Sequence, residues 1–128
     1  MKMATPQISP ALQQQVKKFQ ELQMQLNDLR AVIVQLEQQV REIDRSLKEL
    51  EKLQSDDSVY KSVGAILIKS NVEDVKKELI DSKETMELRL KTYSKQFENA
   101  KTQLTSLREK IVQQAPPFEG VDGPDMGG

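Results

Sequence analysis

The sequence predicts a mainly α-helical protein in which two long helices form an antiparallel coiled coil and are joined by one short β-hairpin. Three observations predict this fold class. Apolar residues alternate at spacings of three and four over two long stretches of the 128-residue chain, as they do along the seam of a coiled coil. One β-prone segment, Val59–Lys69, separates these stretches. Pro116 and Pro117 follow the second stretch, and proline ends a helix because it lacks the backbone N–H.

The first helix is predicted over residues 9–54. Ser9 and Pro10 supply a start signal, because an N-cap hydroxyl accepts a backbone N–H and proline suits the first helical position. Residues 1–8 are expected to form a flexible segment. From Phe19 onward the a and d positions of the seven-residue repeat are apolar without a break: Phe19, Leu22, Leu26, Leu29, Ile33, Leu36, Val40, Ile43, Leu47 and Leu50.

Residues 55–70 are predicted to be a linker that holds one β-hairpin. Two strands, Val59–Val63 and Ala65–Lys69, flank Gly64, which can supply the positive φ of a tight turn. A two-stranded ribbon is marginal in water, and an exposed apolar one invites pairing with other chains. We therefore expect an oligomerisation hub formed by Val59, Tyr60, Val63, Gly64, Ile66, Leu67 and Ile68.

The second helix is predicted over residues 71–115. Ser70 and Glu73 fit a capping box, in which each side chain bonds a backbone N–H of the other residue. The seam continues through Val72, Lys76, Leu79, Lys83, Met86, Leu90, Tyr93, Phe97, Ala100, Leu104, Leu107 and Ile111. Residues 116–128 hold three prolines, four glycines and three acidic residues, which predicts a disordered tail.

The short linker forces the second helix to run back along the first. Pairing residues whose numbers sum to 126 gives seven wholly apolar layers, from Phe19 with Leu107 to Val40 with Met86. A register shifted by one heptad is equally periodic, so the linker length decides between them. Nearer the hairpin, Lys76 and Lys83 occupy seam positions, where a lysine can specify register while its ammonium reaches water. Contact with neighbouring subunits is the alternative role for them.

Beyond the apolar layers, the predicted ends of the two helices become half polar. Gln15 faces Ile111, and a buried glutamine without a partner costs about 1–3 kcal/mol. We therefore expect the ends to splay, with Leu12, Val16, Ile111 and Val112 accessible, although helix ends also fray without any function. Ten glutamines lie among the first 40 residues. An apolar end of low charge suits weak contacts with many partners, for which the candidate residues are Ile8, Leu12, Val16, Phe19, Leu107, Ile111 and Val112.

Composition argues against several classes of function. The chain has no cysteine and no histidine, so the commonest metal ligands and the usual general base are absent. Its formal net charge of −1 favours neither nucleic acid nor an anionic membrane as a partner. We expect no enzyme activity and no cofactor. The sequence also lacks an apolar stretch of about 20 residues or a signal peptide, which makes the cytoplasm the expected location.

The hairpin segment between two coiled-coil arms resembles the beta-type subunit of prefoldin. The residues that carry the resemblance are Val59-Tyr60-Lys61, Gly64 and Ile66-Leu67-Ile68-Lys69, and the resemblance spans about residues 8–115. The alpha-type subunit is a poorer match, because it has two hairpins and this linker holds one. The resemblance implies a hexamer of two alpha-type and four beta-type subunits, whose hairpins form β-barrels and whose arms surround a cavity.

The same resemblance implies an ATP-independent holdase that captures unfolded proteins at the arm tips and delivers them to a group II chaperonin. The sequence contains no GxxxxGK[ST] phosphate-binding loop, so any such work would depend on binding alone. Two alternatives remain open. One is a structural coiled-coil tether without client-holding activity, and the other is an adaptor subunit that uses the hairpin in a different complex.

Overall fold

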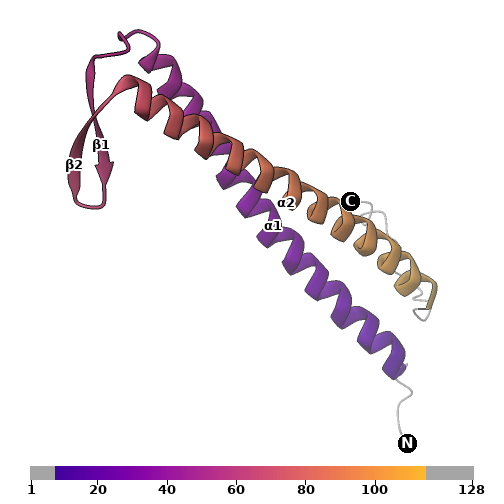
Figure 1. Cartoon of the computed structure of the whole chain (residues 1–128). Coiled ribbons are helices and arrows are strands. Elements are labelled where there is room, and N and C mark those ends of the chain that lie inside the picture. The colour runs from indigo at the N-terminus through magenta and orange to yellow at the C-terminus, as the bar shows by residue number, and fades with distance from the viewer. Residues whose placement is uncertain (1–7, 115–128) are drawn as a thin grey trace, which may run out of the picture. The chain divides into compact units, whose positions relative to one another are not determined.

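The computed structural model describes residues 8–114, which form two long helices joined at one end by a β-hairpin (Figure 1). In chain order the elements are α1 (Pro10–Leu50), β1 (Ser58–Val63), β2 (Ile66–Asn71) and α2 (Val72–Gln114). The predicted fold class is confirmed. The predicted flexible segment, apart from Ile8, and the predicted tail lie outside the described residues. The rest falls into two compact units, residues 8–26 with 99–114 (the terminal unit) and residues 27–98 (the hairpin unit).

Helix α1 begins where the sequence predicts and ends earlier. The Ser9 Oγ accepts a hydrogen bond from the backbone N–H of Leu12 at 3.1 Å, which confirms Ser9 as the N-cap and places Pro10 at the first helical position. The predicted end at residue 54 is wrong, because the helix stops at Leu50. There the backbone tightens into three-residue turns, with the N–H of Leu53 bonded to the carbonyl of Leu50 at 3.0 Å.

The hairpin is antiparallel, and Val63 pairs directly with Ile66 across a two-residue turn. Gly64 has a φ of 58°, and among the described residues no other has a positive φ. A glycine at the first turn position is the signature of a type II′ turn, whose twist suits a hairpin. The predicted second strand, residues 65–69, is therefore shifted. Ala65 belongs to the turn, and β2 extends to Asn71, which pairs with Ser58.

Helix α2 follows β2 without an intervening loop, and its cap is not the predicted one. The Asn71 Oδ1 accepts the backbone N–H of Asp74 at 2.9 Å, and the Asn71 Nδ2 donates to the Asp74 carboxylate at 3.1 Å. Asn71 is thus the N-cap. Ser70 lies one position too early for that role, because α2 begins at Val72 and Asn71 directly precedes it. The described part of the helix reaches Gln114, and the predicted end, residue 115, lies outside the described residues.

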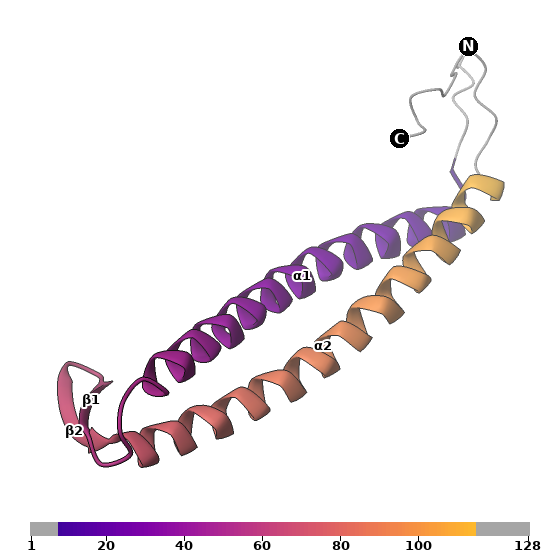
Figure 2. The ribbon, with the colours of Figure 1, turned by 90° about the horizontal axis from the view of Figure 1, so that it is seen from above.

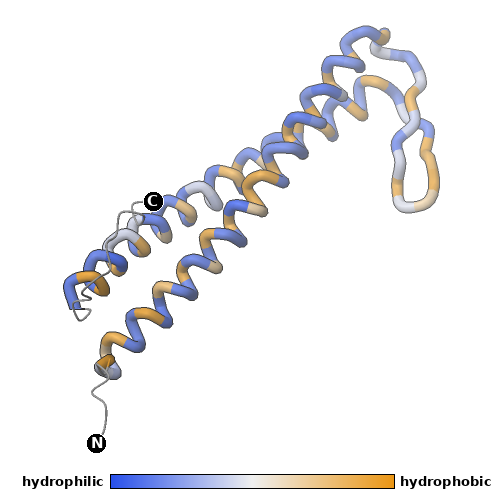
Figure 3. Tube along the Cα trace, turned by 180° about the vertical axis from the view of Figure 1, so that it is seen from behind, coloured by the Kyte–Doolittle hydropathy of each residue, from blue (hydrophilic) through white to orange (hydrophobic). Residues whose placement is uncertain are grey.

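In the hairpin unit, the predicted seam residues are those removed from solvent. Its four d positions on α1 are buried, and Val72 is buried at the start of α2, whereas the a positions are half-buried; the buried set is Leu29, Leu36, Ile43, Leu50 and Val72. Apolar turns recur along both helices in Figure 3. The seam therefore supplies the apolar burial that stabilises this unit.

Two side-chain contacts between α1 and α2 agree with the predicted register in the hairpin unit. The Lys83 ammonium lies 2.7 Å from the Asp44 carboxylate. The Arg30 guanidinium lies 5.4 Å from the centroid of the Phe97 ring, within the range of a cation–π contact. Both pairs of residue numbers sum to 127, one more than the predicted seam layers. Such neighbours are expected where Ile43 faces Lys83 and Leu29 faces Phe97.

The terminal unit contains the start of α1 and the end of α2. Leu12, Leu22 and Ala100 are buried there. The other seam residues of this unit are half-buried: Gln15, Phe19, Leu26, Leu104, Leu107 and Ile111. The heptad pattern therefore predicts the inward-facing residues in this unit too.

Candidate functional site

The hairpin carries a dense set of exposed apolar side chains. Exposed fractions reach 64% for Tyr60, 60% for Ile66 and 70% for Leu67. Val63 and Ile68 are also exposed, and Val59 is half-buried. Apolar colour covers much of this ribbon in Figure 3. Contiguous exposed apolar residues on strands that each have an open outer edge are typical of a surface that binds other chains.

The apolar residues occupy both faces of the ribbon, because side chains alternate along a strand. One face carries Ile68 opposite Lys61 and Ile66 opposite Val63. The other face carries Tyr60 opposite Lys69 and Leu67 opposite Ser62. A hairpin that packed on one partner surface would leave the second face exposed. The arrangement therefore suits a hub in which neighbouring chains cover both faces and both edges.

An ion pair attaches the hairpin to α2 (Figure 2 shows where the two elements meet). The Lys61 ammonium donates to both carboxylate oxygens of Glu78, at 2.9 and 3.1 Å. Since both side chains are partly exposed, the pair contributes at most about 1 kcal/mol to stability. Its main effect is to orient the hairpin, because it joins Lys61 of β1 to Glu78 of α2. The sequence did not predict this partner, since Glu78 is one of many acidic residues outside the seam.

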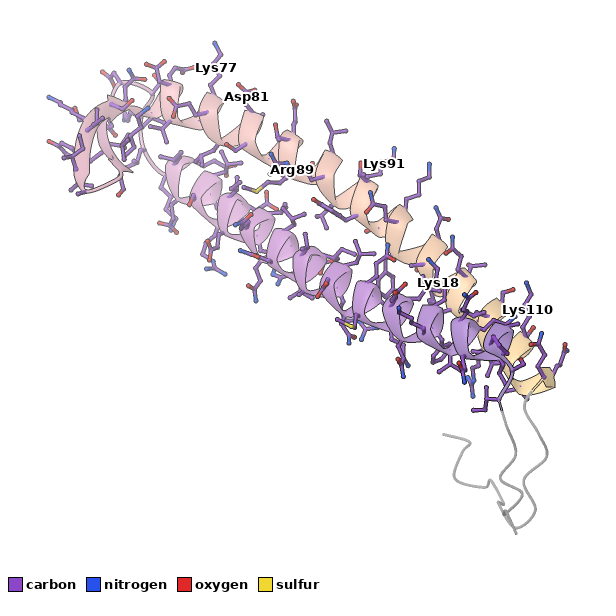
Figure 4. All side chains as sticks on the ribbon, turned by 90° about the horizontal axis from the view of Figure 1, so that it is seen from below. Lys18, Lys77, Asp81, Arg89, Lys91 and Lys110 are labelled. Carbon is purple, nitrogen blue, oxygen red and sulfur yellow. The ribbon has the colours of Figure 1, made fainter. Side chains whose placement is uncertain are left out.

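The surface beside this ion pair is polar. Lys77 and Asp81 of α2, labelled in Figure 4, line a hollow of about 320 Å³ together with Lys61 and Glu78. Among residues 8–114, no group of three or more His, Cys, Asp or Glu side chains could hold a metal ion. Neither described helix is long and apolar enough to cross a membrane. The hairpin's apolar surface is the distinctive feature of this unit.

Lys83 is a seam lysine with a partner in its own chain. Its ammonium is bonded to Asp44, which agrees with the role of a seam lysine that specifies register. The hydrogen bond to Asp44 raises the pKa of Lys83 above its ordinary value of 10.5. Burial lowers this pKa in part, and the charges of Asp44 and Glu87 raise it further.

A raised pKa in the folded state means that the pair stabilises the fold below the unfolded-state pKa. That contribution is lost as the pH rises through the folded-state pKa. The melting temperature of Lys83→Gln, which removes the charge without adding an apolar side chain to the seam, should therefore lie slightly below that of the wild type at neutral pH. The difference between the two melting temperatures should narrow above pH 10.5, as thermal melts followed by circular dichroism would show. The control is Lys91→Gln, which changes an exposed lysine of α2 (Figure 4). A difference in melting temperature that does not depend on pH would contradict the assignment.

The candidate residues of the terminal unit differ widely in exposure. Val112 is 67% exposed and Ile8 is 45% exposed, whereas Leu12 is only 5% exposed. Val16, Phe19, Leu107 and Ile111 are half-buried. The prediction that Leu12 is accessible is wrong, because this side chain is buried. The Gln15 Oε1 is buried without a hydrogen-bond partner. The predicted layer of Gln15 with Ile111 stays a prediction.

Charged side chains of the terminal unit lie outside its seam. Lys18 and Lys110, labelled in Figure 4, are both exposed. Arg108 and Glu109, which precede Val112 by four and three residues, are exposed on the same face of α2. The part of the apolar candidates in binding clients stays a prediction.

Comparison with known proteins identifies the family. A model of the family described as "Prefoldin subunit" matches residues 13–116. The prefoldin subunit beta of Sulfurisphaera tokodaii is 44% identical over 107 residues, covering 84% of this chain and 86% of that protein. The prefoldin subunit beta of Sulfolobus acidocaldarius is 41% identical over the same shares of both chains.

A solved structure agrees with these relatives. The crystal structure of the prefoldin beta subunit from Thermococcus strain KS-1 superposes with a TM-score of 0.76 at 27% identity, covering 88% of this chain and 100% of that one. The resemblance to beta-type subunits that the hairpin predicts is therefore confirmed. The two helices and the single hairpin thus match the architecture of a solved prefoldin beta subunit. The chain belongs to the prefoldin family of chaperone subunits.

Proposed function

We propose that the chain is the beta-type subunit of a hexamer with two alpha-type and four beta-type chains, acting in the cytoplasm as an ATP-independent holdase. The observation that carries the proposal is the exposed apolar hairpin, with Ile66 and Leu67 at least 60% exposed, in a member of the prefoldin family. In the proposed assembly, neighbouring hairpins cover these side chains. Burying apolar surface at about 25 cal/mol per Å² is the driving force for association.

Clients are held by the terminal units in this proposal. Ile8, Leu12, Val16, Phe19, Leu107, Ile111 and Val112 form the apolar contact surface. A single unit offers little exposed apolar area, since Ile8 and Val112 are its most exposed candidates. Several units around one cavity bind the same unfolded chain at once, and multivalency raises the overall affinity by orders of magnitude. The held chain is then delivered to a group II chaperonin.

The test of this function is an aggregation assay with the chain mixed with an alpha-type subunit. A chemically unfolded protein is diluted into the mixture without ATP, and its aggregation is followed by light scattering. We expect suppression by the mixture and refolding after a group II chaperonin and ATP are added. A structural tether predicts no suppression at any ratio. An adaptor predicts assembly with the partner but no protection of the client.

A further inference from the structure

We propose that Gln15 is a client-binding residue whose side-chain carbonyl accepts a main-chain N–H from the unfolded polypeptide. The inference rests on the holdase function proposed above and deepens it. It assigns to this residue a polar contact that the apolar candidates of the terminal unit cannot make. It also explains how an arm can bind polypeptides of unrelated sequence.

The starting observation is an unpaired acceptor. Within the described residues, Gln15 Oε1 is a buried side-chain atom without a hydrogen-bond partner. Gln13, by contrast, lies on the exposed side of α1, and its Nε2 donates to the carbonyl of Ile8 at 3.3 Å. An unpaired acceptor in an apolar environment destabilises the state that buries it. The terminal unit therefore leaves one hydrogen bond of Gln15 unmade.

The neighbours of Gln15 are apolar. On the same face of α1, Leu12 precedes it by three residues and Phe19 follows it by four; Leu12 is buried and Phe19 is half-buried. In α2, Leu107 and Ile111 of the same unit are half-buried seam residues. A hydrogen bond made among such side chains is stronger than one in water, because the local dielectric is low. The site thus combines one acceptor with apolar contact surface.

A main-chain N–H of an unfolded polypeptide is the donor that fits this site. Every residue except proline carries one, whatever its side chain. An unfolded chain also presents apolar side chains next to these donors, which Leu12, Phe19 and Ile111 can contact when the helix ends part. Parting the ends frees the unsatisfied Gln15 carbonyl, so the cost of opening is lower than in an all-apolar seam. The entering N–H then satisfies the acceptor.

The experiment uses the full-length chain assembled with an alpha-type subunit and a pair of fluorescent peptides. One is a short, unstructured apolar peptide, and the other has the same side chains with its backbone amides N-methylated, which removes the N–H donors. Gln15→Leu removes the acceptor and keeps a seam side chain that packs. Gln14→Leu makes the same change one residue away, at an exposed position. Fluorescence anisotropy gives the dissociation constant of each peptide for each assembly.

We expect the wild type to prefer the unmodified peptide and Gln15→Leu to lose about threefold to tenfold of that preference, the worth of one hydrogen bond. The control Gln14→Leu keeps the full preference. An equal preference in all three assemblies overturns the inference. Equal weakening of both peptides by Gln15→Leu also overturns it, because Gln15 then acts only by loosening the helix ends. Absence of aggregation suppression by the wild-type assembly would instead refute the proposed function itself.

Discussion

Replacing Ile66 and Ile68 with aspartate should dissolve the proposed assembly while leaving both helices intact. Both side chains are exposed in the single chain, so the substitutions bury no charge within it. In an assembled hub the same positions would be covered, and an unpaired buried carboxylate costs several kcal/mol. We expect assembly to weaken by more than about a hundredfold. Native mass spectrometry measures the loss of the complex, and far-ultraviolet circular dichroism measures the retained helix content.

A matched control tests whether the loss of assembly is specific to the hairpin or follows from charging any exposed apolar residues. Ile80 and Leu88 of α2 are 43% and 67% exposed, which is close to the 39% of Ile68 and the 60% of Ile66. The double variant Ile80→Asp/Leu88→Asp places the same charges outside the hairpin and should assemble like the wild type. Equal loss of assembly in both double variants would show that the hairpin has no special part. Retained assembly in Ile66→Asp/Ile68→Asp would refute the hub.

Deleting residues 1–16 together with 111–128 should preserve the assembly and abolish suppression of aggregation. The hairpin unit, residues 27–98, is untouched, so the contacts proposed for the hub remain. The deletion removes five of the seven candidate client-binding residues: Ile8, Leu12, Val16, Ile111 and Val112. Multivalent holding depends steeply on the affinity of each arm. Light scattering of a diluted unfolded protein should therefore rise to the level seen without the chaperone.

A shorter deletion provides the control for this experiment. Removing only residues 1–7 and 115–128 leaves α1 and α2 complete and keeps every candidate residue. Suppression should then match that of the full chain. If the shorter deletion alone abolishes suppression, the holding surface lies in the flanking segments. If the longer deletion leaves suppression unchanged, the assignment to the helix ends is refuted.

The helical part of the fold could be read from the sequence because one periodic pattern determines it. Along α1 and α2, the a and d positions are the ones withdrawn from solvent. Boundaries were harder to predict where two residues offer the same chemistry. Ser70 and Asn71 are both good N-caps, and the start of α2 at Val72, with the Asn71 Oδ1 accepting the N–H of Asp74, decides for Asn71. The end of α1 was misplaced because no proline or glycine lies between Leu50 and Gly64.

The candidate sites were predictable to different degrees. The exposed hairpin follows from apolar residues in a ribbon too small to bury them. The accessibility of Leu12 did not follow, because the penalty for burying Gln15 was expected to open the seam, whereas the structure buries Leu12 and the Gln15 Oε1. The contact of Lys61 with Glu78 depends on the angle at which the hairpin meets α2. Periodicity carries no information about that angle.

Native mass spectrometry of the chain mixed with an alpha-type prefoldin subunit shows whether the hairpin is the assembly hub. We expect a complex with the mass of two alpha-type and four beta-type chains, which disappears when Ile66→Asp/Ile68→Asp replaces the wild type. A chain that remains monomeric or dimeric under every mixing condition would contradict this expectation.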